Sequence, residues 1–334
     1  MRKRTLTRLA VAGVLIVVSI FFARWLNIKL YEQGNLWDVA LFQLDEEEDI
    51  LNYDYSCPDF VFSPRQFIRT EYHYCSGYAD PFLIVKDDYL YLFYEYEICD
   101  GNAMINAMRT SDFKEWEDLG TVLQEPFHLS YPNVFEYDGQ IYMVPETNMN
   151  KAVTVYEARN FPYDWTPVKD LLKGHQYVDN TFVEKDGTTY LFTLFGDSDS
   201  LSKPGFHLYE SDSLLGDYEE HPQSPINNDP LNNRCGGAIF EYNGKLIRPA
   251  QKNDVGYGDD LAFYEITELD KENYSERFIK YVHADKSDWD MYGGHHFKSA
   301  LFKGKRIVVM DGLIKDSWIN NRTRKLFDRL SKEQ

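Results

Sequence analysis

Residues 79–95 carry the sequence ADPFLIVKDDYLYLFYE, and the rest of the chain is organised around this unit. Two apolar runs flank a polar segment at residues 86–88, and this pattern predicts two short β-strands joined by a tight turn. A carboxylate stands near each end of the unit, at Asp80 and at Glu95. The same frame returns four more times along the chain, so the unit is a repeat.

The four later copies align with the first copy without a gap. The position of Asp80 is taken by Tyr131, Asp179, Gly236 and His296. The position of Glu95 is taken by Glu146, Leu194, Gln251 and Asp311. Three of the later copies contain Asp-Gly or Asn-Gly between apolar runs, which is a strong signal of a hairpin because a tight turn needs positive φ.

The repeat predicts the fold class. A hairpin cannot bury its apolar face alone, and repeats of about 40–50 residues built from short strands usually stack radially as blades. We therefore expect an all-β fold, a five-bladed β-propeller that occupies residues 66–312 as one domain. The innermost strand of each blade begins near the axis, so the five opening residues are expected to converge on one funnel. A β-sandwich with accidental similarity between its hairpins is the alternative.

The N-terminal residues predict a membrane anchor. Residues 1–8 are rich in Arg and Lys, and residues 9–26 are apolar apart from Arg24, whose long side chain can reach the interface. Basic residues before a span favour a cytoplasmic N-terminus. We expect a cytoplasmic tail at residues 1–8, a single transmembrane signal anchor at residues 9–26, and a propeller on the periplasmic, extracellular or lumenal side. A cleavable signal peptide has a similar apolar core.

Two further segments flank the predicted propeller. Residues 27–65, with an acidic run at residues 45–49, are expected to form a stalk and a lead-in strand. Residues 313–334 are expected to form a C-terminal helix or tail. The net charge of −19 argues against a nucleic-acid partner. Aromatic residues make up 16% of the chain, which suits packed blades and also sugar-stacking surfaces.

The four cysteines match no zinc-binding spacing. On the outer side of a membrane disulfides are allowed. One bridge among Cys57, Cys75 and Cys99 is one interpretation, and free thiols, including Cys235, are the other.

Two aspartates at the opening position suggest glycosyl chemistry. Asp80 and Asp179 are expected to meet in one concave site, where one carboxyl group serves as base or nucleophile and the other as acid or electrostatic support. Mutual repulsion between the two would raise the pKa of one of them. No Gly-rich phosphate loop or Ser/His/Asp order indicates another class of enzyme.

The Asp80-Pro81-Phe82 opening and the five-fold pattern resemble the five-bladed furanosidases, including family 43 glycoside hydrolases. This resemblance implies that Asp80 is the catalytic base and that Asp179 orients and tunes the acid. The family's acid is a Glu that opens a later blade, whereas this chain has Gly236 there, so ordinary hydrolysis is not expected. The resemblance also implies that His296, or His295, lies near the axis beside a calcium ion or water.

A closer resemblance covers most of the chain after the anchor. The motifs ADPF (79–82), HLSYP (128–132), VPET (144–147), LLG (214–216) and RPAQ (248–251) are together similar to the N-terminal propeller domain of glucosamine inositolphosphorylceramide transferases. Plant enzymes of this type carry a separate glycosyltransferase domain after the propeller. We do not expect that domain in this sequence, so its transferase activity is not carried over.

The remaining candidate residues belong to the same funnel. After each turn the second strand returns to the mouth where the first began, so Glu95 and Glu146 are expected near Asp80 and Tyr131. We assign catalytic roles to Asp80, Asp179, Glu146 and His128, because His titrates near neutral pH. We assign substrate binding to Glu95, Tyr131, Arg248 and Gln251, and a metal role to His296. Arg248 could pair with a carboxylate or with a substrate phosphate, and structural ion pairing is the alternative for Glu146 and Arg248.

The resulting hypothesis is a membrane-anchored carbohydrate-active propeller that takes part in glycosyl transfer or processing during extracytoplasmic glycan assembly. Its partners would be a glycan or an activated sugar. One alternative is a non-catalytic glycan-binding or scaffold propeller. The other is a glycoside hydrolase whose acid has moved, for example to Glu95 or Glu146.

Overall fold

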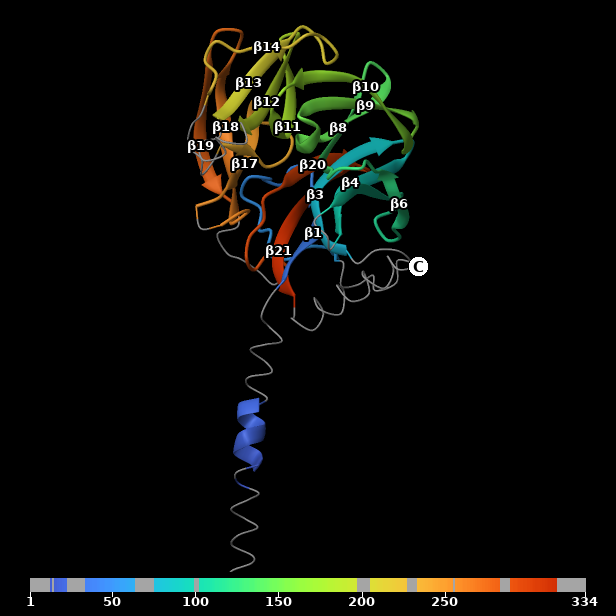
Figure 1. Cartoon of the computed structure of the whole chain (residues 1–334), viewed down its shortest axis with the longest axis vertical. Coiled ribbons are helices and arrows are strands. Elements are labelled where there is room, and N and C mark those ends of the chain that lie inside the picture. The colour runs from blue at the N-terminus through green and yellow to red at the C-terminus, as the bar shows by residue number, and fades with distance from the viewer. Residues whose placement is uncertain are drawn as a thin grey trace, which may run out of the picture.

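The computed structural model describes residues 13, 15–22, 34–63, 75–98, 102–196, 205–226, 233–254, 256–282 and 289–316. The strands form antiparallel groups arranged as the blades of a propeller (Figure 1). Blade 1 contains β3 (Cys75–Lys86), β4 (Tyr89–Ile98), β5 (Ala103–Thr110) and β6 (Glu117–Leu123). Blade 2 contains β7 (Ser130–Tyr137), β8 (Gln140–Glu146), β9 (Ala152–Asn160) and β10 (Tyr163–Lys173), with the 3-10 turn η1 (Asn148–Asn150) after β8.

The other blades follow in chain order. Blade 3 contains β11 (Gln176–Lys185), β12 (Thr188–Gly196), β13 (Gly205–Ser211) and β14 (Glu219–Glu220). Blade 4 contains β15 (Arg234–Cys235), β16 (Phe240–Tyr242), β17 (Lys245–Lys252), β18 (Asp260–Leu269) and β19 (Tyr274–Tyr281). Blade 5 contains β20 (Phe297–Phe302) and β21 (Lys305–Asp316), completed by β1 (Gly34–Asp45) and β2 (Phe60–Phe62).

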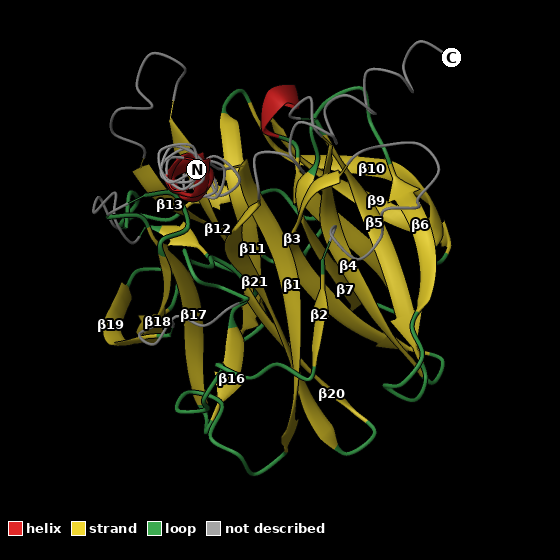
Figure 2. Cartoon of the chain, turned by 90° about the horizontal axis from the view of Figure 1, so that it is seen from below, coloured by secondary structure: helices red, strands yellow, loops and turns green. Residues whose placement is uncertain are grey.

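The strand that precedes the first repeat closes the ring. β1 pairs with β21 along its whole length, from Gly34 opposite Asp316 to Asp45 opposite Lys305. It also meets β3 in parallel at Trp37 and Gly77, so β1 lies between the last blade and the first (Figure 2). Residues 27–65, expected as a stalk and lead-in strand, therefore contribute two strands to blade 5, and the propeller begins before residue 66.

The predicted hairpin turns are confirmed. Asp138, Asp186, Asn243 and Lys303 have positive φ, and each is followed by a glycine with positive φ. Tight hairpin turns require this left-handed backbone, which Asn, Asp and Gly adopt at low cost. Each predicted turn joins two antiparallel strands at the register that the ungapped alignment implies.

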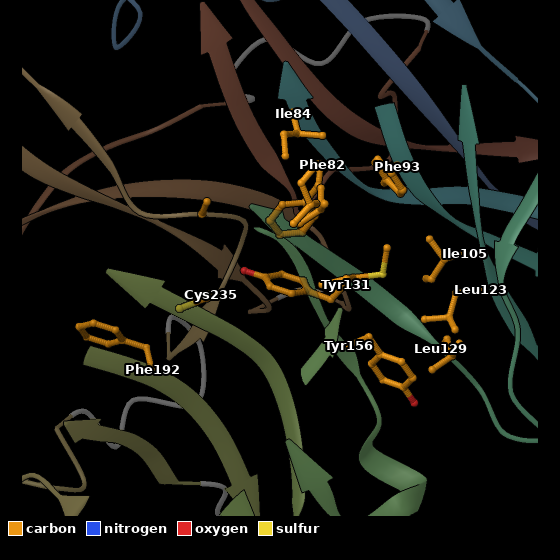
Figure 3. Packing of buried hydrophobic residues seen from close by; sticks show 14 of the residues in the cluster. Phe82, Ile84, Phe93, Ile105, Leu123, Leu129, Tyr131, Tyr156, Phe192 and Cys235 are labelled. Carbon is orange, nitrogen blue, oxygen red and sulfur yellow. The ribbon is translucent and has the colours of Figure 1, made fainter. Parts of the chain in front are cut away.

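Buried apolar clusters fill the spaces between blades. One cluster joins blades 5 and 1 and includes Leu41 and Leu92, and another joins blades 5 and 4 and includes Phe42 and Phe263. The largest cluster lies around the inner strands, where the ring of Tyr131 packs beside Phe82 (Figure 3). The blades are thus joined by side-chain packing as well as by β1, which holds their opening residues around one axis.

The transmembrane helix is not shown. Within the predicted anchor at residues 9–26 the structure describes residues 13 and 15–22, which are helical. Among the described residues we find no helix of the length and apolar character needed to cross a bilayer. Residues 1–8 and the rest of the anchor lie outside the described part of the chain, so the anchor stays a prediction.

Two other expectations are only partly covered. Of the predicted C-terminal helix or tail at residues 313–334, residues 313–316 belong to β21 and the others lie outside the described residues. Cys57 is an exposed free thiol and Cys235 a buried one, which agrees with the free-thiol interpretation for these two residues. Cys99 and the side chain of Cys75 lie outside the described residues.

Candidate functional site

A pocket of about 310 Å³ opens where the inner strands meet, and all five blades contribute to its wall. Its carboxyl groups belong to Asp80, Glu95, Glu97, Glu146 and Asp179. Its other functional side chains belong to Trp37, His128, Ser130, Asn148, Arg234, Tyr257 and His295. The convergence expected from the repeat is therefore observed for Asp80, Asp179, Glu95, Glu146 and His128.

The opening residues of blades 1, 2 and 3 share one backbone distortion. Asp80, Tyr131 and Asp179 have φ of 50°, 47° and 52°. At each of them the pairing of the two inner strands shifts its register. A bulge with a left-handed residue bends the strand and turns a side chain that would otherwise point into a blade. This strained geometry is a common mark of functional sites, and it brings both aspartates to the axis.

Asp80 is fixed by blades 2 and 5. Its Oδ2 accepts the backbone N–H of Tyr131 at 3.0 Å, and its own N–H donates to Asp311 Oδ2 at 3.2 Å. Its Oδ1 lies 3.4 Å from His296 Nδ1 and 3.8 Å from His295 Nε2. Burial pushes the pKa of Asp80 upward, but the hydrogen bond from His296 and the charges of the two histidines outweigh it, and the pKa is lowered. Asp80 is therefore ionised at neutral pH.

Asp179 is held by blade 4. Its Oδ2 accepts from Arg234 Nε at 2.5 Å and from Gln251 Nε2 at 3.1 Å. Burial raises the pKa of Asp179, and the Arg234 guanidinium offsets part of that rise. Gln251, predicted to bind substrate, acts here through Asp179 and does not line the pocket.

Glu146 is a carboxyl group that keeps its proton near neutral pH. Its Oε2 accepts the backbone N–H of Asp179 at 3.2 Å and its Oε1 accepts from Asn148 Nδ2 at 2.8 Å. Burial and the negative charge of Asp179 raise the pKa of Glu146 to about 8. The pocket thus combines an ionised aspartate with a protonated glutamate.

Glu95 is a second glutamate with a raised pKa, and it lies beside His128. His128 Nε2 lies 3.2 Å from Glu95 Oε1. Burial raises the pKa of Glu95 to about 7, against the opposing hydrogen bond and charge of His128. The pair can hold or release one proton near neutral pH.

The blade 5 side holds a group that sequence reasoning largely missed. His295 Nδ1 lies 2.6 Å from Asp311 Oδ2, and its Nε2 lies 3.1 Å from the hydroxyl of Tyr257. Although burial opposes both shifts, the mutual attraction raises the pKa of His295 to about 9 and lowers that of Asp311 to about 2. Asp311 occupies the closing position of the fifth repeat, and this position was the sequence feature that could have identified the group. Nothing in the repeat pointed to Tyr257 or Arg234.

Besides Gln251, three more predicted residues lie outside the pocket wall. Tyr131 is fully buried, and its hydroxyl bonds Thr181 Oγ1 at 2.6 Å while accepting the N–H of Gly237 at 3.0 Å. His296 is also fully buried, with its ring against Phe82 and Tyr131. Both contact the Asp80 carboxylate, Tyr131 through its backbone N–H and His296 through Nδ1.

Arg248 is the third. It is fully buried and donates to Glu276 through Nε at 2.7 Å and Nη2 at 2.8 Å. Its guanidinium also lies over the rings of Phe206 and Tyr264. The assignment of Arg248 to substrate binding is therefore corrected to the structural ion pair that was its alternative.

The missing acid at Gly236 has a steric cause. A Cβ at this position would lie 2.5 Å from Leu261 Cδ1 and 2.6 Å from the carbonyl oxygen of His295. No side chain fits there without movement of the backbone. A glycine at this position is therefore part of how blade 4 packs against blade 5.

The expected calcium ion does not fit the described residues. Asp80, His295 and Asp311 offer ligand atoms within 4.8 Å of one another. Calcium takes six to eight oxygen ligands, whereas the oxygens of Asp311 already accept the N–H groups of Asp80, His295 and His296. This group is a hydrogen-bonded network, and we assign no step to an ion.

Comparison with known proteins agrees with the resemblance inferred from the motifs. The family model described as glucosamine inositolphosphorylceramide transferase 1, N-terminal, matches residues 67–313. Relatives of that name from Oryza sativa subsp. japonica and from Arabidopsis thaliana are both 36% identical, over 254 and 244 residues. These alignments cover 73% and 70% of this chain but 34% and 32% of the relatives, so the chain spans about a third of their length.

Solved structures support the fold. A thermostable family 43 glycoside hydrolase is 14% identical with a TM-score of 0.51, covering 71% of this chain and 89% of its own. A family 117 glycoside hydrolase from Zobellia galactanivorans is 13% identical with a TM-score of 0.50, covering 81% and 90%. At these identities the likeness concerns the propeller fold alone. By the family match and the identity to its relatives, the chain belongs to the family of the N-terminal domain of glucosamine inositolphosphorylceramide transferase 1.

Proposed function

We propose that this chain is a carbohydrate-active propeller that makes or breaks a glycosidic bond during glycan assembly. The observation that carries the proposal is the pairing of an ionised Asp80 with a protonated Glu146 in one pocket of about 310 Å³. Glycosyl chemistry uses two carboxyl groups whose environments push their pKa values apart. The pocket volume suits a sugar unit and not a long polymer segment.

We propose a role for each carboxyl group. Asp80, ionised and fixed by the Tyr131 N–H, takes the proton from the attacking hydroxyl as general base. Glu146 donates its proton to the departing oxygen as general acid. Asp179 and its partner Arg234 set the charge beside Glu146. His128 and Glu95 exchange protons with solvent, since His128 is partly exposed.

The relatives suggest the sugar. Both relatives are named glucosamine inositolphosphorylceramide transferase 1, a name that includes an amino sugar. The cationic groups Arg234 and His295 are each paired with an aspartate, so the remaining carboxyl groups give the pocket an acidic character. Such a pocket suits an amino sugar, and we include a glucosamine-type unit in the proposal.

The proposal also includes membrane attachment. It is supported by the basic residues 1–8 and the apolar residues 9–26, which favour a propeller outside the cytoplasm. The test is protease protection in sealed right-side-out vesicles, where an external protease should remove the propeller. Protection of the propeller from that protease would contradict this orientation.

The function is tested with the full chain in membranes. We would incubate it with activated amino and neutral sugars, with inositol phospholipids and with 4-nitrophenyl glycosides, and follow products by mass spectrometry. Asp80→Asn should reduce turnover at least about 1,000-fold. Asp186→Asn, at an exposed hairpin turn, is the matched control and should keep full activity.

The outcomes separate the candidate functions. A gain of one glycosyl unit on an acceptor identifies a transferase, and free sugar identifies a hydrolase with Glu146 as the displaced acid. Saturable glycan binding without any product, unchanged in Asp80→Asn, would leave a glycan-binding propeller. The glycan-binding propeller is favoured by Gly236, which stands where the family 43 resemblance implies a catalytic Glu.

A further inference from the structure

An ion pair and a hydrogen bond link the buried axis of blade 5 to the pocket. Asp311 contacts His295 Nδ1 at 2.6 Å, and His295 Nε2 lies 3.1 Å from the Tyr257 hydroxyl. Asp311 is fully buried and His295 nearly so, whereas 55% of Tyr257 is exposed. The arrangement of an orienting carboxylate, an imidazole and a hydroxyl is one that enzymes use to position a reactive or binding hydroxyl.

The buried end of this linkage is rigid. Asp311 Oδ1 accepts the N–H groups of His295 at 2.8 Å and His296 at 2.9 Å, and Asp311 Oδ2 accepts the N–H of Asp80. The Asp311 carboxylate therefore holds the backbone at His295 and His296 and at Asp80, in addition to the imidazole of His295. A side chain with this many partners has one orientation.

The exposed end is held by close packing. Trp37 stacks on the His295 ring with centroids 4.5 Å apart, and the Tyr257 ring meets His295 edge-on at 5.1 Å. Gly258, which follows Tyr257, has a φ of +65° and no room for a Cβ, because one would lie 2.7 Å from Trp37 Cη2. The loop that carries Tyr257 is therefore seated on the aromatic pair from β1 and blade 5.

The charges fix the direction of the hydrogen bonds. Two carboxylates face the imidazole, Asp311 at Nδ1 and Asp80 at 3.8 Å from Nε2, and together they favour the cationic ring. Both ring nitrogens then donate, so the Tyr257 oxygen accepts from Nε2. The hydroxyl proton of Tyr257 has no other partner among the residues that the structure describes, and it is left for a ligand.

We propose that Asp311, His295 and Tyr257 form a relay, an ion pair followed by a hydrogen bond, that presents the Tyr257 hydroxyl as a fixed donor to an oxygen of the sugar bound against Asp80. The hydroxyl and the Asp80 carboxylate both lie within 4 Å of His295 Nε2, so the donor and the base share one corner of the pocket. The identity of the ligand rests on the proposed function, whereas the relay rests on the protein's own contacts. Tyr257 would be a sugar-contacting residue, and His295 and Asp311 positioning residues.

The relay is tested first without any substrate. In the full chain labelled with ¹⁵N at its eight histidines, His295 is assigned as the signal lost in His295→Gln. Both ring nitrogens of His295 should carry a proton at neutral pH. Tyr257→Phe should shift the Nε2 signal and leave the Nδ1 signal unchanged. Tyr281→Phe, a partly exposed tyrosine of blade 4 outside the pocket, is the control. An Nε2 signal unchanged in Tyr257→Phe overturns the relay.

The donor role is tested by binding and turnover of the amino sugars and 4-nitrophenyl glycosides used above. Tyr257→Phe keeps the ring that packs on His295 and removes only the hydroxyl, so the fold is retained. Loss of one positioned donor should reduce kcat/KM about 100-fold. Because the relay acts as a unit, His295→Gln combined with Tyr257→Phe should be no slower than the slower single variant. Additive losses would show that the two side chains act separately.

The results distinguish this inference from the function on which it rests. If the wild-type chain binds a sugar without turning it over, the catalytic proposal fails, and weaker binding by Tyr257→Phe still supports the donor. If Tyr257→Phe binds and reacts like wild type, the donor role is wrong although the chemistry stands. If the wild-type chain binds no sugar of the panel, both are overturned.

Discussion

The two sides of the pocket are built in different ways. On the side of blades 1, 2 and 3, the four carboxyl groups Asp80, Glu95, Glu146 and Asp179 occupy repeated positions, and the opening residues share one left-handed bulge. On the side of blades 4 and 5, the opening residues Gly236 and His296 bring no carboxyl group. There the pocket is lined by Arg234 and by Tyr257, which comes from the loop between β17 and β18, together with His295. These four carboxyl groups of the pocket therefore come from repeated positions, whereas Arg234, Tyr257 and His295, which stand outside those positions, supply hydrogen-bond donors.

The largest expected effect is on stability, and it tests whether Arg248 of blade 4 has a structural role. Arg248→Met should lower the free energy of unfolding by about 3–5 kcal/mol, because it leaves the largely covered Glu276 carboxylate without its ionic partner. Chemical denaturation measures the change. Lys245→Met removes an exposed partner of Glu265 and should cost less than about 1 kcal/mol. Equal losses in the two variants would contradict the structural role of Arg248.

The next prediction concerns the position without an acid. Gly236→Ala should destabilise the protein by about 1–3 kcal/mol, because its methyl group meets Leu261 and the backbone of His295. Gly256→Ala is the control, since a Cβ there meets nothing within 4 Å. Thermal unfolding of both variants gives the comparison. A fully stable Gly236→Ala would mean that blade 4 can accept a side chain at this place.

A pH profile tests the acid on the repeated side. The pKa of Glu146 is raised to about 8 by burial and by Asp179, so the proton needed for an acid is present below that value. Activity should therefore fall as the pH rises through about 8, and Glu146→Gln should lose this limb together with most of the turnover. The same shift makes the folded state lose stability as the pH rises toward 8 in wild type but less so in Glu146→Gln. A basic limb that persists in the variant belongs to another group.

The smallest effect is expected at the pair of Glu95 and His128. His128 lowers the pKa of Glu95 against the effect of burial, so His128→Gln should move that pKa above its value of about 7. Carbon-detected NMR of labelled glutamate side chains measures the titration. His207→Gln, whose partner Glu220 lies on the outer strand of blade 3, should leave the titration of Glu95 unchanged. A Glu95 signal that does not move in His128→Gln would remove this pair from the proton exchange.

Sequence reasoning was most successful where the repeat dictates position. The ungapped alignment placed Asp80, Asp179, Glu95 and Glu146 in one site, because equivalent residues of stacked blades occupy equivalent places around the axis. It failed for Arg248, which lies on the opposite face of β17 from Gln251 and pairs with Glu276 of β19. It also missed Tyr257, because a loop residue between two strands carries no periodic signal.

The sequence by itself determined the all-β propeller, its hairpin turns and the family, because these depend on local pattern and on motifs that survive in one dimension. Only the tertiary structure decided that β1 closes the ring and brings Trp37 to the pocket, since strand pairing over such a distance has no local signature. The protonation of Glu146 and the relay through His295 were likewise decided in three dimensions. Burial and the distances between charges set a pKa, and both arise only when the blades come together.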